Sequence, residues 1–389
     1  MMRALAAAAV TLALAAPGLH AQRADTTRLA LLWSVVEGAH ETADSLGVLS
    51  GIAMDPNGTV YVSDRAENKL WVFDARGRSA RGIGRRGQGP GEFHAPTGIA
   101  IGPDNNLYVR DQNHVTRFAA DPQTRRLTRY DTRYNAGAFN DWLSMLASRF
   151  DERGRLYYPN FNQGGLTTRM GQWWIFSPAG ERVDSIPVPF IEGTPPAWAS
   201  VRESANGGRL LRGMNHVPFA GIPAWDVTPR GTVVYTSGRE YLIREVDRAG
   251  RTVREFRRDV PPLRIPAAER RDSLEAIRAR RDSVSSVPRT QVVGVPDDVW
   301  ALRLPKMYPP IRNIFAAPDG LLWVRRWVPN GHARTVFDVF EADGRFKTVV
   351  ELPAYLLPDI TPVLRLGAIA GIGADAETGA MTVLRFGRR

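Results

Sequence analysis

Cysteine is absent from the 389-residue sequence. Disulfide bonds, a lipid anchor on a cysteine at a processing site and a nucleophilic cysteine are therefore all excluded. The Gly-x-Ser-x-Gly pattern that places a nucleophilic serine on a sharp turn is also missing. A chain without disulfide bonds must be held together by its buried core. Hydrophobic residues make up 43% of the sequence, which is enough to form such a core.

Long apolar runs are scarce, and only residues 4–16 form one. This run follows Arg3, precedes the small-residue segment Leu19–Ala21 and is too short to cross a bilayer. The pattern predicts a cleaved signal peptide over residues 1–21, with Gln22 as the first mature residue. We therefore expect a periplasmic or extracellular protein without a membrane span.

Lysine occurs only at positions 69, 306 and 347, so arginine supplies nearly all of the 51 basic residues. The formal net charge is +11, which would suit a nucleic-acid partner. Export away from nucleic acid and the scattering of the arginines along the chain argue against that partner. The charge favours instead an attraction to acidic surfaces or anionic ligands.

Glycine and proline are abundant, at 36 and 28 residues, which is typical of many turns between short strands. Residues 51–64 and 98–111 are two clear copies of one unit. In each copy an apolar strand enters a tight polar turn, and a second strand with a central Tyr-Val leaves it. Weaker copies follow at residues 150–158, 227–235, 315–324 and 372–383. The spacing of roughly 48 residues between the first copies fits four strands per blade of a β-propeller.

The six copies predict an all-β fold over residues 22–389, a monomeric six-bladed β-propeller with four-stranded antiparallel blades. The last copy stops soon after its second strand, and the apolar segment Leu29–Val36 has no other assignment. We expect this segment to add a strand to the last blade and so close the ring. Residues 266–287 are charged, carry apolar residues at helical spacing and begin with proline. This pattern predicts a helical insert between blades four and five.

Two segments carry a family resemblance. Residues 87–100 resemble the linker and first strand of NHL repeats, and residues 107–118 resemble the continuation of the same repeat. The whole chain, with its helical insert followed by residues 308–315, is similar to exported bacterial proteins described only as six-bladed β-propellers. That family has no settled activity, so the resemblance implies the fold and the compartment and no chemistry.

The sequence contains possible cofactor-binding and metal-ligand residues, but the residues around them do not suit such a site. Residues 82–87 match a dinucleotide loop, but the Gly-Pro-Gly segment at 89–91 prevents the helix that such a loop needs. The histidines at positions 94, 114, 216 and 332 stand alone in the sequence. We therefore predict no cofactor. A calcium ion in the central channel, held by carbonyl and carboxylate oxygens, stays open as an alternative.

Propeller geometry brings one set of residues to the same place, because the start of a first strand and the end of a second strand lie on one face of the ring. The candidate site residues on or near that face are Arg110, Arg312, Arg325, Arg326, Arg385, Asp64, Asp111, Trp142, Tyr158 and Trp327. We expect an arginine-rich, aromatic-edged mouth for an anionic ligand, since a guanidinium holds a carboxylate or phosphate with two hydrogen bonds. The alternative is that these arginines and aspartates pair between blades, or that the aspartates satisfy backbone donors.

The preferred function is therefore a binding or scaffold module for a protein, a peptide or a cell-envelope glycan, since rigid propeller faces carry binding loops. A second function class is a channel-site lyase or lactone hydrolase that uses a divalent metal held by carboxylate and histidine ligands. A third class, RNA binding through a basic face, is disfavoured by the expected export. No catalytic residue is predicted.

Overall fold

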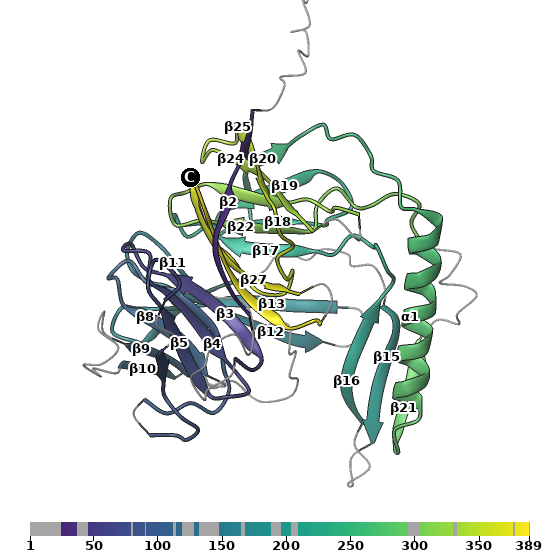
Figure 1. The fold of residues 1–389 in the computed structure, drawn as a ribbon, viewed down its shortest axis with the longest axis horizontal. Coiled ribbons are helices and arrows are strands. Elements are labelled where there is room, and N and C mark those ends of the chain that lie inside the picture. The colour runs from purple at the N-terminus through teal and green to yellow at the C-terminus, as the bar shows by residue number, and fades with distance from the viewer. Residues whose placement is uncertain are drawn as a thin grey trace, which may run out of the picture.

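The computed structural model describes residues 25–36, 46–78, 81–89, 91–111, 114–118, 128–131, 148–164, 168–187, 196–203, 209–294, 304–329, 333–375 and 378–388. Six of the sheets among these residues are the blades of a ring, and a smaller sheet stands beside it with one long helix (Figure 1). The expected signal peptide, residues 1–21, and Gln22 lie outside the described residues. No helix in the described part of the chain is long and apolar enough to span a membrane.

The first five blades follow the chain, and each strand pairs with its sequence neighbour. Blade one consists of β3 (Leu49–Met54), β4 (Val60–Asp64), β5 (Lys69–Phe73) and β6 (Arg81–Ile83). Blade two consists of β7 (Pro96–Ile101), β8 (Leu107–Asp111), β9 (His114–Phe118) and β10 (Thr128–Asp131). Blade three consists of β11 (Arg149–Phe150), β12 (Leu156–Gly164), β13 (Thr168–Phe176) and β14 (Arg182–Pro187).

Blades four and five have the same order. Blade four consists of β17 (Ala224–Val227), β18 (Val233–Thr236), β19 (Leu242–Val246) and β20 (Thr252–Arg257). Blade five consists of β22 (Asn313–Ala316), β23 (Leu322–Arg325), β24 (Thr335–Phe340) and β25 (Phe346–Leu352). These two blades lie on either side of the predicted helical insert.

Burial decreases from the inner to the outer strands of a blade. Every residue of β3 and β4 is buried, because these strands are covered on both faces by neighbouring blades. In the outermost strand β14, all residues except Ile186 are exposed. The near-continuous apolar character of the first repeat strands therefore reflects two covered faces rather than one.

The turn between the first and second strands explains the polar residues of each repeat. Gly58 and Gly320 occupy this turn with φ of 86° and 82°, a region that favours glycine. Asn105 takes the same place in blade two with φ of 58°, which asparagine tolerates better than most residues. The Gly58 N–H donates to the Asp55 carbonyl at 3.1 Å and closes the turn.

Blade six joins the two ends of the described chain. It consists of β26 (Val363–Arg365), β27 (Ala368–Ala374) and β28 (Met381–Gly387), and the N-terminal strand β2 (Ala30–Val36) pairs antiparallel with β28. This confirms the predicted closure by an N-terminal strand. A further short strand, β1 (Thr26–Arg28), pairs parallel with β25 of blade five. The same N-terminal segment therefore ties blades five and six together.

The sixth repeat copy is displaced by one strand from its predicted place. Residues 372–383 span β27, β28 and the turn between them, so they lie between the second and third strands of the blade. The first strand is β26, whose Val363–Arg365 line the central channel with the inner strands of the other blades. Blade six therefore takes three strands from the C-terminal segment and only its outermost strand from the N-terminal one.

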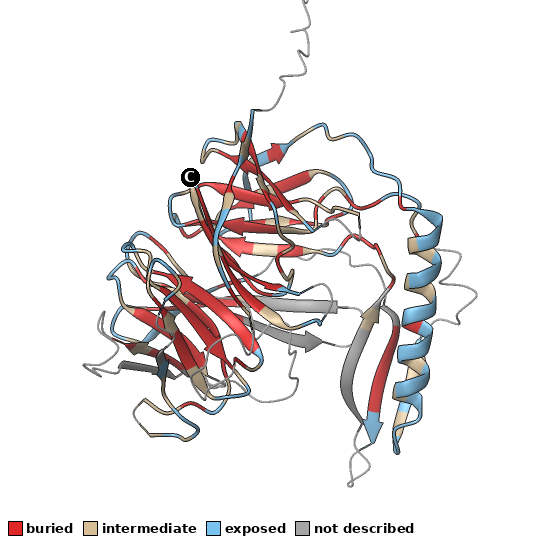
Figure 2. Ribbon diagram, viewed as in Figure 1, coloured by how far each residue is buried: buried red, intermediate tan, exposed pale blue. Residues whose placement is uncertain are grey.

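The insert contains a helix, as predicted, and it is followed by a strand that completes a small sheet. Helix α1 (Ala267–Ser285) starts directly after Pro266, and β21 (Thr290–Gly294) follows it. Strand β21 pairs with β15 (Pro196–Glu203), which forms a hairpin with β16 (Arg209–His216). The repeat pattern does not predict this hairpin, because its partner strand β21 lies beyond the whole of blade four. Most of α1 faces outward, with Ile277 as its buried residue (Figure 2).

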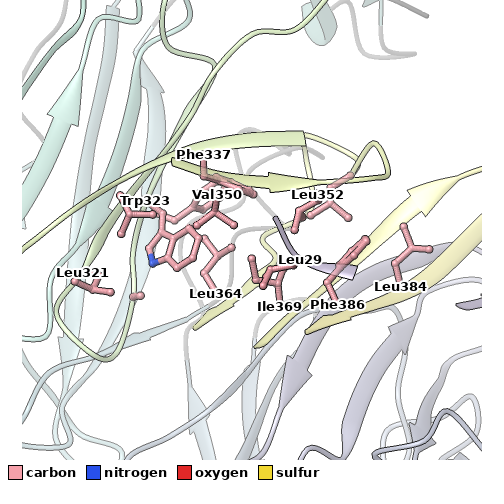
Figure 3. Close-up of a cluster of buried hydrophobic side chains, with 14 residues drawn as sticks. Leu29, Leu321, Trp323, Phe337, Val350, Leu352, Leu364, Ile369, Leu384 and Phe386 are labelled. Carbon is pink, nitrogen blue, oxygen red and sulfur yellow. The ribbon is translucent and has the colours of Figure 1, made fainter. Parts of the chain in front are cut away.

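Apolar side chains between adjacent blades hold the ring together. Between blades five and six, Trp323 and Phe337 pack toward Ile369 and Phe386, with Leu29 of the N-terminal segment among them (Figure 3). Leu29 is 3% exposed, although it lies in the short connection between β1 and β2. Closure of the ring therefore depends on apolar burial as well as on strand pairing.

Candidate functional site

The two aspartates of the predicted set are engaged by donors of their own blade. Asp64 is fully buried and accepts the backbone N–H groups of Gly47 at 2.7 Å and of Ala66 and Glu67 at 3.1 Å, together with the Trp71 indole N–H at 3.0 Å. Asp111, at the matching position in blade two, accepts the backbone N–H groups of His94 and Ala95 at 2.9 and 2.8 Å. Both carboxylates therefore anchor the chain that enters their blade.

Arg110 and Tyr158 meet across the boundary between blades two and three. Arg110 is 5% exposed at the end of β8, and its guanidinium carbon lies 4.6 Å from the centre of the buried Tyr158 ring. This is the geometry of a cation–π contact. Trp142, which was expected near this pair, lies outside the described residues.

Arg385 lies at the other end of the ring. Its Nη2 is 3.9 Å from the point that a Cβ on Gly58 would occupy, and Gly58 belongs to the turn that opens β4. Asp64 is at the opposite end of that strand. Arg385 lies at this end because β28 is the third strand of its blade, and a third strand runs in the direction opposite to a second strand. The structure therefore does not bring Arg385 to the predicted face.

Arg326 contacts a buried carboxylate between blades four and five. Its Nε is 3.5 Å from Asp338 Oδ1, and the guanidinium of Arg258 also pairs with that carboxylate. The Tyr241 hydroxyl donates to Asp338 Oδ2 at 2.6 Å. Because Asp338 is fully buried and holds two arginines and a tyrosine, this cluster is a bridge between neighbouring blades. It corresponds to the alternative in which arginine and aspartate pair between blades.

Arg312 and Arg325 form a cationic pair that has no carboxylate partner among the described residues. Arg325 ends β23, is 2% exposed and donates from Nη2 to the Leu356 carbonyl. Arg312 precedes β22, and its backbone N–H donates to the Arg325 carbonyl at 2.8 Å. Among the described residues, no carboxylate oxygen lies within 4.0 Å of either guanidinium. We call these two residues the Arg312–Arg325 mouth.

Aromatic rings flank both arginines of the mouth. The Arg325 guanidinium carbon lies 5.1 Å from the Tyr355 ring centre, and that of Arg312 lies 4.0 Å from the Trp327 ring centre. Trp327 in turn stacks on Tyr308 at 6.1 Å and contacts Phe219 at 6.2 Å. These rings orient the arginines through cation–π contacts and place no carboxylate against them.

The electrostatics of the mouth favour an anion. The pKa of Arg325 is lowered to about 10, chiefly by burial and also by the positive charge of Arg312, whereas Tyr355 and Asp359 act to raise it. Arg325 is still charged at neutral pH, so a buried cation stands beside a second one. At the mouth, the buried donors Arg312 Nε and Trp327 Nε1 also have no acceptor among the described residues. Buried charges and donors of this kind are costly unless a partner arrives.

The insert approaches the mouth through its aromatic edge. Tyr308, which stacks on Trp327, donates its hydroxyl to Glu269 Oε2 on α1 at 2.5 Å. Phe219 and Tyr308 belong to the same apolar cluster as Ile277 of α1. Sequence reasoning missed Tyr308, Phe219 and Tyr355, because none of them belongs to a repeat strand.

Metal-ligand side chains do not gather in the part of the chain that the structure describes. There, no three histidine, aspartate or glutamate side chains come close enough together to hold a metal ion. The described residues therefore supply no side-chain set for the calcium ion that was left open, nor for the metal that the lyase or hydrolase alternative requires.

Comparisons with known proteins agree with the ring of blades. A family model described as a 6-bladed beta-propeller matches residues 41–136. No curated protein sequence matches the chain. The solved structures that resemble this chain have little sequence identity with it. A DUF4221-family protein from Bacteroides vulgatus has 10% identity and a TM-score of 0.49, with 92% of this chain and 97% of that chain covered.

Two further solved structures have names that refer to a ligand or a reaction. Regucalcin from Agrobacterium tumefaciens, titled a calcium-binding protein, has 12% identity and a TM-score of 0.40 over 94% of this chain and 97% of that one. Virginiamycin B lyase from Staphylococcus aureus has 12% identity and a TM-score of 0.38 over 90% and 98%. These likenesses carry no argument about ligand or reaction. The six blades and the family model identify the chain as a six-bladed β-propeller.

Proposed function

We propose that this propeller is an exported binding module, and that the Arg312–Arg325 mouth holds an anionic group of a peptide or a cell-envelope glycan. One observation carries the proposal: Arg325 is 2% exposed and charged, and no described carboxylate oxygen lies within 4.0 Å of its guanidinium. Two other arginines of the ring, both partly buried, have such partners. Arg149 forms a two-pronged pair with Asp226 at 2.6 and 2.8 Å, and Arg258 pairs with Asp338.

The chemistry of the mouth selects a carboxylate, a phosphate or a sulfate. Arg312 and Arg325 present several N–H donors from neighbouring backbone positions, which suits a planar or tetrahedral anion. Trp327 Nε1 adds a neutral donor beside them. The ring of Trp327 and the adjacent Tyr308 offer flat apolar faces to the remainder of the ligand, as sugar rings and peptide side chains require.

The mouth comes from rigid elements. Arg325 belongs to a fully buried strand, and Arg312 is held to it by a backbone hydrogen bond. A site fixed in this way loses little conformational entropy when a ligand binds. The metal-dependent lyase or hydrolase has no comparable support in the described residues, so binding is the function that we put forward.

Thermal unfolding with added anions tests the proposal. The probes are glucuronate, glutarate and inorganic phosphate, each compared with an uncharged sugar at equal ionic strength. A ligand present at 100 times its Kd stabilises the folded state by about 2.7 kcal/mol, which should raise the Tm by a few °C. The rise should disappear in Arg312→Gln.

The matched control is Arg76→Gln, which removes the same charge from an exposed turn. This control should keep the full response to the anion. Loss of the response in both variants would indicate a general charge effect, and no response to any of the anions in the unaltered protein would refute the proposal for these classes of ligand.

A further inference from the structure

The opposite end of the ring contains a cavity of about 450 Å³. All six blades contribute to it, because it lies where the first strand of each blade ends and turns. Phe315–Pro318 line it at the end of β22, whereas Arg312 precedes the start of the same strand. The cavity and the Arg312–Arg325 mouth are therefore at different ends of the central channel.

The wall of this cavity is mainly apolar. Its apolar side chains come from all six blades, and they include Ile52, Ile99, Phe150, Val227, Phe315 and Leu364. Most of these side chains are packed into the ring on their other sides. A pocket of this volume and composition is of the size that takes a small molecule.

The cationic side chains in the wall are already engaged. Arg149 is neutralised by the two-pronged pair with Asp226. Arg365 donates to the carbonyl oxygens of Met54 and Asp55 at 3.2 and 3.3 Å, across the junction between blades six and one. Asp151 pairs with Arg155 at 2.6 Å. An anionic ligand would therefore gain little here, in contrast to the mouth at the other end.

Two hydroxyl groups give the cavity its polar points. Ser148 and Thr361 both line it and are 4% and 8% exposed. Neither hydroxyl makes a hydrogen bond within the described residues. They come from blades three and six, so they lie on different sides of the same cavity. Groups of this kind fix the orientation of a mainly apolar ligand.

We propose that this end of the channel is a second binding site, which takes an uncharged, largely apolar small molecule with one or two hydrogen-bonding groups. The site is independent of the mouth, because it uses no residue of that mouth. Its recognition comes from shape and apolar burial, with Ser148 and Thr361 as the polar contacts.

Binding of the neutral fluorescent probe N-phenyl-1-naphthylamine to the whole chain tests this proposal. The probe has an apolar body and one N–H group, and its emission rises when it leaves water. We expect saturable binding of one probe per chain. Ala100→Trp, which places a large ring at a lining position of intermediate exposure, should weaken binding at least tenfold.

The matched control is Ala380→Trp, which adds the same side chain in the turn before β28, away from the lining. It should leave binding unchanged. Equal binding by Ala100→Trp and the unaltered protein would place the probe elsewhere and overturn the proposal, and so would the absence of saturable binding.

A second measurement covers the case in which Ala100→Trp does not fold. The chain has no cysteine, so Ala100→Cys supplies a single thiol inside the cavity. N-ethylmaleimide should modify this thiol, and saturating probe should slow the reaction at least tenfold. An unchanged rate in the presence of the probe would contradict the assignment. Arg312→Gln should bind the probe normally, which separates this site from the proposed function.

Discussion

Replacement of Arg325 by methionine separates a binding role from a structural one. The substitution keeps an unbranched side chain of similar length in a position that is 2% exposed, and removes the charge. Burial lowers the pKa of Arg325 to about 10, which is between two and three pKa units below the ordinary value for arginine. At about 1.4 kcal/mol per pKa unit, burial disfavours the charged side chain by about 3 kcal/mol.

Removal of the buried charge should therefore stabilise the fold. Two interactions of the Arg325 side chain offset part of this stabilisation, because methionine cannot make them. The Leu356 carbonyl accepts a charged hydrogen bond from Arg325, which contributes about 1.5 to 3 kcal/mol, and the Tyr355 ring lies beside the guanidinium. We therefore expect Arg325→Met to leave the free energy of unfolding unchanged or to raise it by up to about 1.5 kcal/mol. Urea unfolding at neutral pH measures this difference.

Arg149→Met is the matched control. Arg149 neutralises Asp226, which is 2% exposed, so the same substitution there leaves a buried carboxylate without its partner. Loss of about 3 to 5 kcal/mol is the expected result. If Arg325→Met cost as much as Arg149→Met, Arg325 would be a structural cation with a partner in the fold, and our reasoning about the mouth would be refuted.

The pH dependence of the Arg325→Met difference follows from the same pKa. A base whose pKa is lower in the folded state destabilises the fold while it is charged in both states, and this effect fades only above the folded pKa. Burial lowers this pKa to about 10. The difference between the unaltered protein and Arg325→Met should therefore be constant between about pH 6 and pH 9. A difference that changes across that interval would implicate another titrating group.

Three further predictions concern the frame around the sites. Asp64→Asn should lower the free energy of unfolding by about 2 to 4 kcal/mol in urea, because the carboxylate accepts four hydrogen bonds in a buried position; an unchanged midpoint would contradict its anchoring role. Leu29→Ala should cost about 2 to 4 kcal/mol in the same assay, since Leu29 packs between blades five and six, whereas Leu32→Ala at an exposed position of β2 should cost little. The pKa of Asp74 is lowered, chiefly by the backbone N–H of Arg78, and that of Asp247 is lowered, chiefly by the Arg251 side chain. Such carboxylates stabilise the fold above their unfolded pKa and lose that effect as the pH falls through the folded pKa, so Asp74→Asn/Asp247→Asn should flatten the decline of the Tm below about pH 4; an unaltered decline would refute this.

Much of the fold could be predicted because it repeats. Each blade carries its own apolar strands and polar turn, so the copies at residues 51–64 and 98–111 already define the unit. The closing strand at Leu29–Val36 followed from the need to remove an open edge. Blade six was misaligned by one strand because β26 has only three residues, and the repeat pattern matched the next hairpin along.

The insert shows where local patterns stop being informative. Residues 266–287 carry their helical period within one segment, so the helix could be predicted. The β15–β16 hairpin depends on pairing with β21, and Val201 and Gln291 are register partners from opposite sides of blade four. No local signal in residues 196–216 indicates that distant pairing.

The sequence could predict where the candidate site lies, but not which of its arginines pair with a carboxylate. Strand ends placed Arg312 and Arg325 on one face, but the sequence could not show that Arg326 reaches Asp338 while Arg325 has no such partner in the described part of the chain. Arg385 was misplaced through the error in blade six. The apolar cavity at the other end had no sequence signal, because its lining consists of ordinary residues of the first strands and of the segments next to them.

The most direct test of the central claim is an anion titration followed by the arginine side-chain Nε–H signals in ¹H–¹⁵N NMR spectra. The Arg312 signal is assigned by its loss in Arg312→Gln. If the mouth holds an anionic ligand, this signal should shift in a saturable way as glucuronate is added, while the signal of the exposed Arg76 stays in place. Uniform, unsaturated shifts of exposed arginines with no change at Arg312 would contradict the account.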